Sequence, residues 1–166
     1  MDRVRVGIVG VGKMGRTHID ALKDVDLGEA VAVTDPAGFP NAGIDLASEY
    51  GLECEPTIEG LVSRDDIDAI IVTTPHALHA EHALAAIKAG KHVLVEKPLE
   101  LTLQKCDDVI QAAREENVKL MVAQSHRYWE GDAIAKQLLD EGAIGQLLMC
   151  RDTLAGSGYR KHNPDR

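Results

Sequence analysis

A glycine-rich turn between a strand and a helix constrains the fold of this chain more than any other sequence feature. Residues 4–9, VRVGIV, are mostly β-branched and predict a buried strand. The residues that follow, GVGKMG, match the pattern G-x-G-x-x-G, and a helical spacing of apolar residues begins directly after them. Gly10 permits a tight turn, Gly12 lets the backbone approach a pyrophosphate, and Gly15 lets the helix lie close to the strand. Because a helix N-terminus also offers free N–H groups to phosphates, this order of elements predicts a dinucleotide site.

An acidic residue stands at the spacing that this interpretation requires. Residues 29–35, EAVAVTD, predict a second strand that ends at Asp35, 20 residues after Gly15. At this separation a carboxylate meets the adenosine ribose hydroxyls. The alternative is that Asp35 only starts a turn, which Asp does well, but the two features in register favour the cofactor interpretation. The carboxylate repels a 2′-phosphate and residues 36–41 contain no Lys or Arg, so we expect NAD rather than NADP.

Strands and helices alternate over residues 1–123. Short apolar runs are followed by longer amphipathic segments, and Pro75 and Pro98 stop two of the strands because proline lacks the N–H of a ladder. This alternation with short loops predicts right-handed crossovers and a parallel, doubly wound α/β sheet, so we expect a Rossmann-type domain. Its further strands are predicted at 52–56, 69–74, 91–96 and 119–123, and its further helices at 41–50, 57–64, 76–89 and 102–117.

The last part of the chain has a different character. A helix is predicted over residues 132–141, a strand over 146–154 and a polar tail over 155–166. The strand needs hydrogen-bonding neighbours that the remaining residues are too few to supply. We therefore interpret residues 124–166 as a connecting helix and the first strand of a second α/β domain that is otherwise absent.

Composition argues against several classes of function. With 27 acidic and 18 basic side chains the formal net charge is −9, and no basic stripe is present to meet nucleic-acid phosphates. No apolar run is long enough to cross a membrane, and no signal peptide precedes the first strand. Three widely spaced cysteines without a C-x-x-C pair predict neither a disulfide framework nor a zinc site, and we expect a cytoplasmic protein.

Three histidines follow one another at a helical spacing that resembles a metal motif. In the series His76, His79 and His82, successive pairs are neighbours on a helix, but the outer two point about 120° apart. Only Glu81 is close by and there is no cysteine, so we expect no metal site. We expect His79 to face the cofactor crevice and His82 to be structural or solvent-exposed.

Polar residues follow two of the predicted central strands. In an open parallel sheet, ligands bind at the carboxyl ends of the strands, near the reversal of strand order. Residues 73–76, TTPH, and 96–98, EKP, stand at two such ends and are expected to share one crevice with the glycine turn. A lysine there can orient a substrate hydroxyl and share its proton while a hydride leaves the carbon. The alternative for Lys97 is an ordinary surface lysine at a strand end.

A resemblance to a known family rests on two stretches of the sequence. The segment TTPHALHAEHALAAIKAGKHVLVEKPLELT, taken with GVGKMG, resembles the glucose-fructose oxidoreductase, inositol dehydrogenase and rhizopine-catabolism family of NAD(P)-dependent oxidoreductases. By this resemblance Lys97 is the substrate-facing catalytic lysine, Glu96 lies beside the cofactor ribose, and Pro75 and His76 line the nicotinamide pocket. The full set of expected cofactor contacts is Gly10, Gly12, Lys13, Met14, Gly15, Asp35, Thr73, Thr74, Pro75, His76, His79, Glu96 and Lys97.

The resemblance also implies an enzyme of which part is absent. Family members carry a second α/β domain that supplies a histidine as proton acceptor and builds oligomers, whereas this chain ends at Arg166. The expected function is the cofactor-binding part of an NAD(P)-dependent oxidoreductase that transfers hydride between the nicotinamide and a carbinol carbon of a sugar, cyclitol or related polyol. We expect the 166-residue chain alone to be inactive. The alternatives are a freestanding, non-catalytic NAD(H)-binding module and a subunit completed by another chain. The expected partners are a small-molecule substrate and, when the second domain is present, further copies of the protein, but neither nucleic acid nor a membrane.

Overall fold

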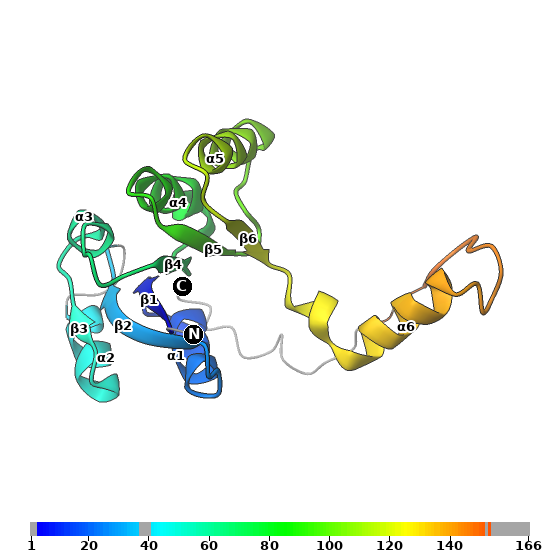
Figure 1. Cartoon of the computed structure of the whole chain (residues 1–166), viewed down its shortest axis with the longest axis horizontal. Helices are drawn as coiled ribbons and strands as arrows, with labels where there is room; N and C mark the ends of the chain where they lie inside the picture. Colours follow the sequence, from blue (N-terminus) through cyan, green and yellow to red (C-terminus); the bar gives the residue numbers. More distant parts are fainter. Residues whose placement is uncertain (1–2, 37–40, 152, 154–166) are drawn as a thin grey trace, which may run out of the picture. The chain divides into compact units, whose positions relative to one another are not determined.

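The computed structural model describes residues 3–36, 41–151 and 153. The chain divides into two compact units, of which the first ends at Gln124 and the second begins at Ser125. The first unit is a sheet with helices on both faces, as Figure 1 shows. The second unit contains one α-helix among its described residues.

Six strands form the sheet of the first unit: β1 (Val4–Val9), β2 (Gly28–Thr34), β3 (Glu53–Cys54), β4 (Ala69–Val72), β5 (His92–Glu96) and β6 (Leu120–Ala123). All neighbouring pairs are parallel. The order is β3-β2-β1-β4-β5-β6, so the direction of growth reverses between β1 and β4. This is the order of a doubly wound Rossmann sheet, and the predicted fold class is confirmed.

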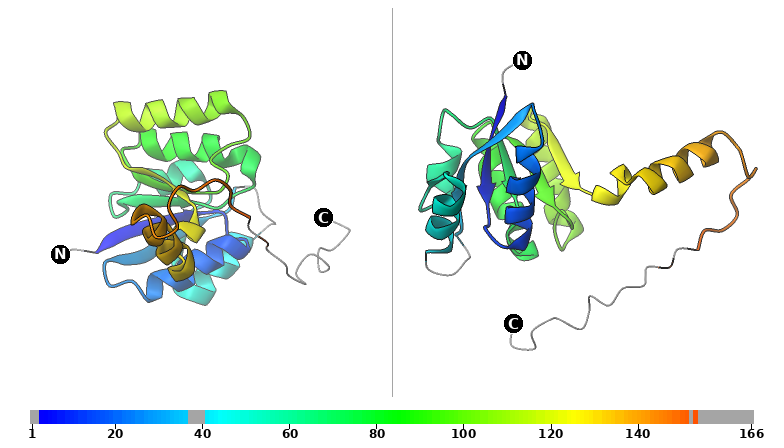
Figure 2. Two further views of the ribbon diagram at one scale, coloured as in Figure 1. Left: turned by 90° about the vertical axis from the view of Figure 1, so that its right-hand side faces the viewer. Right: turned by 90° about the horizontal axis from the view of Figure 1, so that it is seen from below.

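Five helices cover this sheet: α1 (Lys13–Lys23), α2 (Ala42–Tyr50), α3 (Ile58–Val62), α4 (His79–Lys88) and α5 (Leu103–Glu115). The apolar residues of α3, α4 and α5 pack on one face, and those of α1 and α2 pack on the other. Figure 2 (left) shows the strands between the green helices α4 and α5 and the blue helix α1. Along β4, Ile70 and Val72 belong to the first of these cores and Ile71 to the second, as strand geometry requires.

Local sequence signals set the ends of several helices. The hydroxyls of Thr57 and Thr102 accept hydrogen bonds from the first turns of α3 and α5. Gly51 has a φ of +69° at the end of α2, a conformation that glycine adopts without strain. The helix predicted from His76 is divided, because a 3-10 turn, η1 (His76–Leu78), precedes α4. Among the described residues, no helix combines the length and the apolar character needed to cross a bilayer.

The second unit differs from its prediction. Its helix, α6 (Glu130–Asp140), follows a 3-10 turn, η2 (Ser125–Tyr128). The strand predicted over 146–154 is wrong for the described part of that range, since residues 146–151 and 153 form no strand. Strands are stabilised by ladder bonds to a neighbour, and Leu148, which is 85% exposed, has none among the described residues. Residues 152 and 154–166, including the predicted polar tail, lie outside the described residues.

Candidate cofactor and active site

Contacts from β2 and β4 hold the glycine turn that follows β1. The N–H of Gly10 donates to the carbonyl of Thr34 at 2.8 Å, and the hydroxyl of Thr73 donates to the carbonyl of Gly10 at 2.7 Å. Gly10 has a φ of +96°, and a Cβ there would lie 2.8 Å from the carbonyl carbon of Thr73, so only glycine fits. A Cβ at Gly15 would overlap the carbonyl oxygen of Gly10. The turn therefore brings the carboxyl ends of β1, β2 and β4 to one place.

Gly12 differs from the other two glycines because open space surrounds it. Apart from its two chain neighbours, no heavy atom of the described structure lies within 4 Å of a Cβ built at Gly12. Gly12 is also the N-cap of α1, whose first turn has no side-chain cap and no acidic residue. Lys13 and Met14 lie exposed in that turn. A helix N-terminus without a capping side chain, beside an open cradle, fits the pyrophosphate of a dinucleotide.

Asp35 directly follows β2 and lies at the same edge of the sheet as the glycine turn. The residue before it, Thr34, accepts the hydrogen bond from Gly10. Asp35 is half-buried. This position, at the end of the strand next to β1, suits a carboxylate that accepts hydrogen bonds from ribose hydroxyls. Most of the turn predicted after it, residues 37–40, lies outside the described residues.

His79 lies in the interior rather than in the crevice. It is fully buried, with Nδ1 2.7 Å from the carbonyl oxygen of Pro98 and Nε2 2.8 Å from that of Thr74. The prediction that His79 faces the cofactor crevice is therefore wrong, because backbone carbonyls occupy both ring nitrogens. The ring instead links the loop after β4 to the loop after β5.

The side chains of Thr74, which follows β4, and His82 on α4 form a hydrogen bond. Oγ1 of Thr74 lies 2.9 Å from Nδ1 of His82, and both residues are buried. Burial lowers the pKa of the His82 imidazole. His82 is thus structural, one of the two expected possibilities, and the hydroxyl of Thr74 faces α4 instead of the crevice. The next two residues, Pro75 and His76, are exposed.

Glu96 ends β5 with a carboxylate that is almost completely buried. Its Oε1 lies 3.0 Å from Nε2 of His18 on α1, and its Oε2 accepts a hydrogen bond from the backbone N–H of Lys97 at 3.1 Å. Lys97 itself is exposed, and no described residue accepts a hydrogen bond from its Nζ. The ammonium of Lys97 is therefore free to meet a ligand at the edge where the glycine turn lies.

The model of the oxidoreductase family with an NAD-binding Rossmann fold matches residues 4–124. The chain belongs to this family. The resemblance inferred from the sequence is confirmed, and so is NAD as the family's cofactor.

The proteins similar to this chain include enzymes that are named for different reactions. Inositol 2-dehydrogenase 3 of Saccharopolyspora erythraea is 39% identical over 148 residues, which cover 88% of this chain and 43% of that protein. A 2,7-anhydro-N-acetylneuraminate hydratase of Mediterraneibacter gnavus is 33% identical over 164 residues, which cover 99% of this chain and 42% of the relative. The crystal structure of scyllo-inositol dehydrogenase from Lactobacillus casei with bound cofactor NAD(H) and scyllo-inositol has a TM-score of 0.81 at 28% identity, over 87% of this chain and 43% of that one. The chain thus spans less than half the length of these relatives.

Two polar residues near the site, His18 and Glu100, were not predicted from the sequence. His18 lies on the buried side of α1 next to Ile19. A polar residue among the apolar residues on that side of the helix was the sequence signal that could have identified it. The side chain of Glu100 is 1% exposed and accepts hydrogen bonds from the N–H groups of Leu101 at 2.6 Å and Ala80 at 3.3 Å. Burial raises the pKa of the Glu100 carboxyl, but these hydrogen bonds outweigh it, so the net pKa lies below its usual value.

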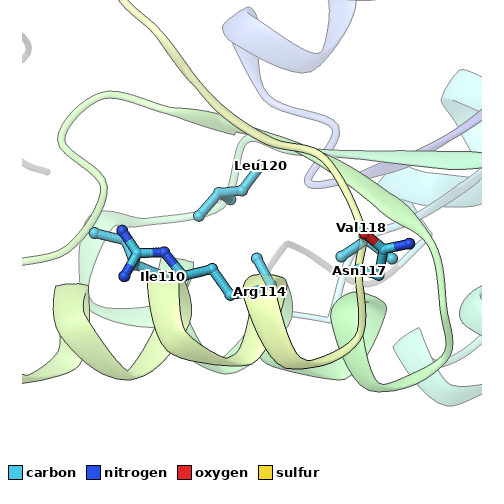
Figure 3. Close-up of a pocket in the computed structure, with 6 residues that line it drawn as sticks. Ile110, Arg114, Asn117, Val118 and Leu120 are labelled. Carbon is cyan, nitrogen blue, oxygen red and sulfur yellow. The ribbon is translucent and has the colours of Figure 1, made fainter.

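One cavity lined by described residues lies between α5 and β6, away from the carboxyl ends of the strands. Its volume is about 460 Å³. Figure 3 shows Ile110 and Arg114 reaching it from α5, Leu120 from β6, and Asn117 and Val118 from the turn between them. Its lining contains one charged side chain and no acid–base pair. Within the described parts of the chain, no three His, Cys, Asp or Glu side chains are grouped to hold a metal ion.

Proposed function

We propose that this chain is the cofactor-binding part of an NAD-dependent oxidoreductase that transfers hydride between the nicotinamide and a carbinol carbon of a sugar, cyclitol or related polyol. The observation that carries the proposal is the placement of Lys97. Its exposed ammonium follows β5, at the carboxyl edge of the sheet, and no described residue accepts a hydrogen bond from it. A lysine at this position can orient a substrate hydroxyl and take up or return its proton.

The proposed cofactor contacts follow the edge of the sheet. The N-terminus of α1 and the open space at Gly12 hold the pyrophosphate, and Asp35 accepts hydrogen bonds from the adenosine ribose. Pro75 and His76 line the nicotinamide side, where both are exposed. Bound NAD supplies the hydride acceptor for the carbinol carbon. In this arrangement residues 1–123 form the cofactor domain and residues 124–166 begin a second domain.

Two kinds of relative guide the choice of substrate. The inositol dehydrogenases among the relatives support a cyclitol or another polyol. The relative named as a hydratase of 2,7-anhydro-N-acetylneuraminate makes an anhydro sugar acid the natural competitor. The site residues are compatible with both substrate classes, because a proton-transferring lysine and a hydride acceptor can act on any secondary alcohol.

A substrate panel tests the proposal. Formation or consumption of NADH is followed with scyllo-inositol, other inositols, aldohexoses and 2,7-anhydro-N-acetylneuraminate, for this chain and for any longer natural form of it. Turnover of a polyol that is lost in Lys97→Ala supports the proposed function. Binding of NAD(H) without turnover by every form supports a non-catalytic NAD(H)-binding module instead, and absence of NAD(H) binding refutes both.

A further inference from the structure

We infer that His18 is a positioning residue for Lys97 and acts through the buried carboxylate of Glu96. The inference rests on the proposed role of Lys97 in proton transfer. His18 lies on α1, the helix that follows the glycine turn, whereas Glu96 and Lys97 lie at the end of β5. The strand that precedes α1, β1, is not a neighbour of β5 in the sheet, because β4 lies between them. The contact between His18 and Glu96 therefore joins the phosphate side of the site to its lysine.

Each oxygen of the Glu96 carboxylate has its own donor. An ionised carboxylate oxygen only accepts hydrogen bonds, so the Nε2–H of His18 donates to Oε1 at 3.0 Å and the N–H of Lys97 donates to Oε2 at 3.1 Å. No other described group donates to either oxygen. The side chain of Glu96 is 10% exposed and that of His18 is 19% exposed. Because a buried carboxylate is costly unless its oxygens are bonded, these two bonds set its orientation.

The orientation of the carboxylate matters because Lys97 is held only by its backbone. Its side chain is exposed, and no described residue accepts a hydrogen bond from Nζ. The N–H of Lys97 is held by Glu96, and the carbonyl of the next residue, Pro98, lies 2.7 Å from Nδ1 of His79. Removing the donor of His18 leaves Oε1 buried without a partner, so the carboxylate turns towards water and releases the N–H of Lys97. A displacement of about 1 Å at such a group costs about 10²-fold in rate.

Three variants separate this role from general stability. His18→Leu removes the donor, whereas His18→Gln keeps an N–H donor at nearly the position of Nε2. Arg16→Gln is the matched control, because Arg16 lies on the same helix and forms an exposed ion pair with Glu49 at 2.5 Å. The melting temperature of each variant is measured first, so that an effect of unfolding is recognised.

The first measurement needs no catalysis and follows the backbone amide of Lys97 by NMR, with and without NAD. In His18→Leu the amide proton is expected to move upfield and to exchange with solvent about fivefold faster or more, since it loses a charge-assisted hydrogen bond. His18→Gln and Arg16→Gln are expected to keep the unmodified shift and rate. An unchanged Lys97 amide in His18→Leu overturns the inference, as does an equal change in all three variants.

The second measurement is steady-state kinetics on the substrate that the panel identifies. His18→Leu is expected to lower kcat by about 10-fold to 10²-fold with little change in the affinity for NAD(H), and His18→Gln to restore most of the rate. Loss of affinity with an unchanged kcat contradicts a positioning role. If neither this chain nor any longer natural form of it turns over a polyol, the proposed function fails, but a Lys97 amide that responds to His18→Leu alone still supports the link from His18 through Glu96.

Discussion

Replacing Gly12 with valine is expected to weaken cofactor binding strongly while leaving the fold intact. Gly12 has a φ of −67° and a ψ of −165°, an extended conformation that other residues adopt without strain. Apart from its chain neighbours, no described heavy atom lies within 4 Å of its Cβ position, so the new side chain begins in open space. A side chain restricts the unfolded chain, but valine is a poorer N-cap than glycine, so the free energy of unfolding is expected to change by no more than about 1 kcal/mol. The melting temperature then shifts by no more than about 4 °C.

The same open space is where the pyrophosphate must approach. A branched side chain there holds the phosphates away from the N–H groups of α1, and hydrogen bonds to a charged group contribute about 1.5–3 kcal/mol. The dissociation constant of NAD(H) is therefore expected to rise by about 10-fold to 100-fold or more. Gly15→Ala is the contrasting variant, since its Cβ would overlap the carbonyl oxygen of Gly10. That oxygen accepts the hydroxyl of Thr73 and cannot move freely, so about 1–3 kcal/mol of stability is lost.

Calorimetric titration with NAD(H) and thermal melts followed by far-UV circular dichroism measure the two effects. Gly131→Val on α6 is the control, because nothing described lies within 4 Å of a Cβ there either. Unchanged affinity in Gly12→Val would show that the phosphates bind elsewhere. A larger loss of stability in Gly12→Val than in Gly15→Ala would refute the reasoning from local space.

The remaining predictions concern three other side chains. Asp35→Ser removes the carboxylate that repels a 2′-phosphate. By calorimetry, the unmodified protein is expected to bind NAD(H) more tightly than NADP(H), and the difference between the two affinities is expected to be smaller in the variant. Equal affinities for the two cofactors in the unmodified protein contradict this prediction. In a form of the protein that carries the second domain, Lys97→Ala lowers polyol turnover by about 10²-fold or more while NAD(H) affinity persists, and an unchanged rate places proton transfer elsewhere. Asp68→Asn removes the carboxylate that Arg5 binds at 2.8 Å, a hydrogen bond that lowers its pKa to about 2. With a pKa of about 4 in the unfolded chain, this stabilisation is complete above pH 4 and is lost as the pH falls towards 2. Since both side chains are more than a third exposed, the variant is less stable by only about 1 kcal/mol at neutral pH, and equal melting temperatures at pH 7 refute the effect.

The orientation of His79, in the segment after β4, could not be predicted from the sequence. The sequence predicts a continuous helix from His76, and we expect from the sequence that His79 faces the crevice. The structure begins α4 only at His79, after a 3-10 turn, and so changes the phase of every side chain that follows. His79 and His82 consequently point into the protein, where they bond to the carbonyl and the hydroxyl of Thr74. The strand predicted over 146–154 does not form among its described residues, 146–151 and 153, for a different reason, because a strand needs a neighbour that accepts its hydrogen bonds.

The sequence by itself determined the glycine turn, the alternation of strands and helices, the acidic residue after β2 and the Glu-Lys-Pro motif after β5. These are properties of adjacent residues: backbone freedom at glycine, the missing N–H of proline and the spacing of apolar side chains. Only the tertiary structure decided which polar groups meet. His18 and Glu96 are 78 residues apart in the chain, and their contact exists because the order of the strands brings α1 to the end of β5. Hydrogen bonds between such distant groups depend on the packed sheet, and no local pattern in the chain encodes them.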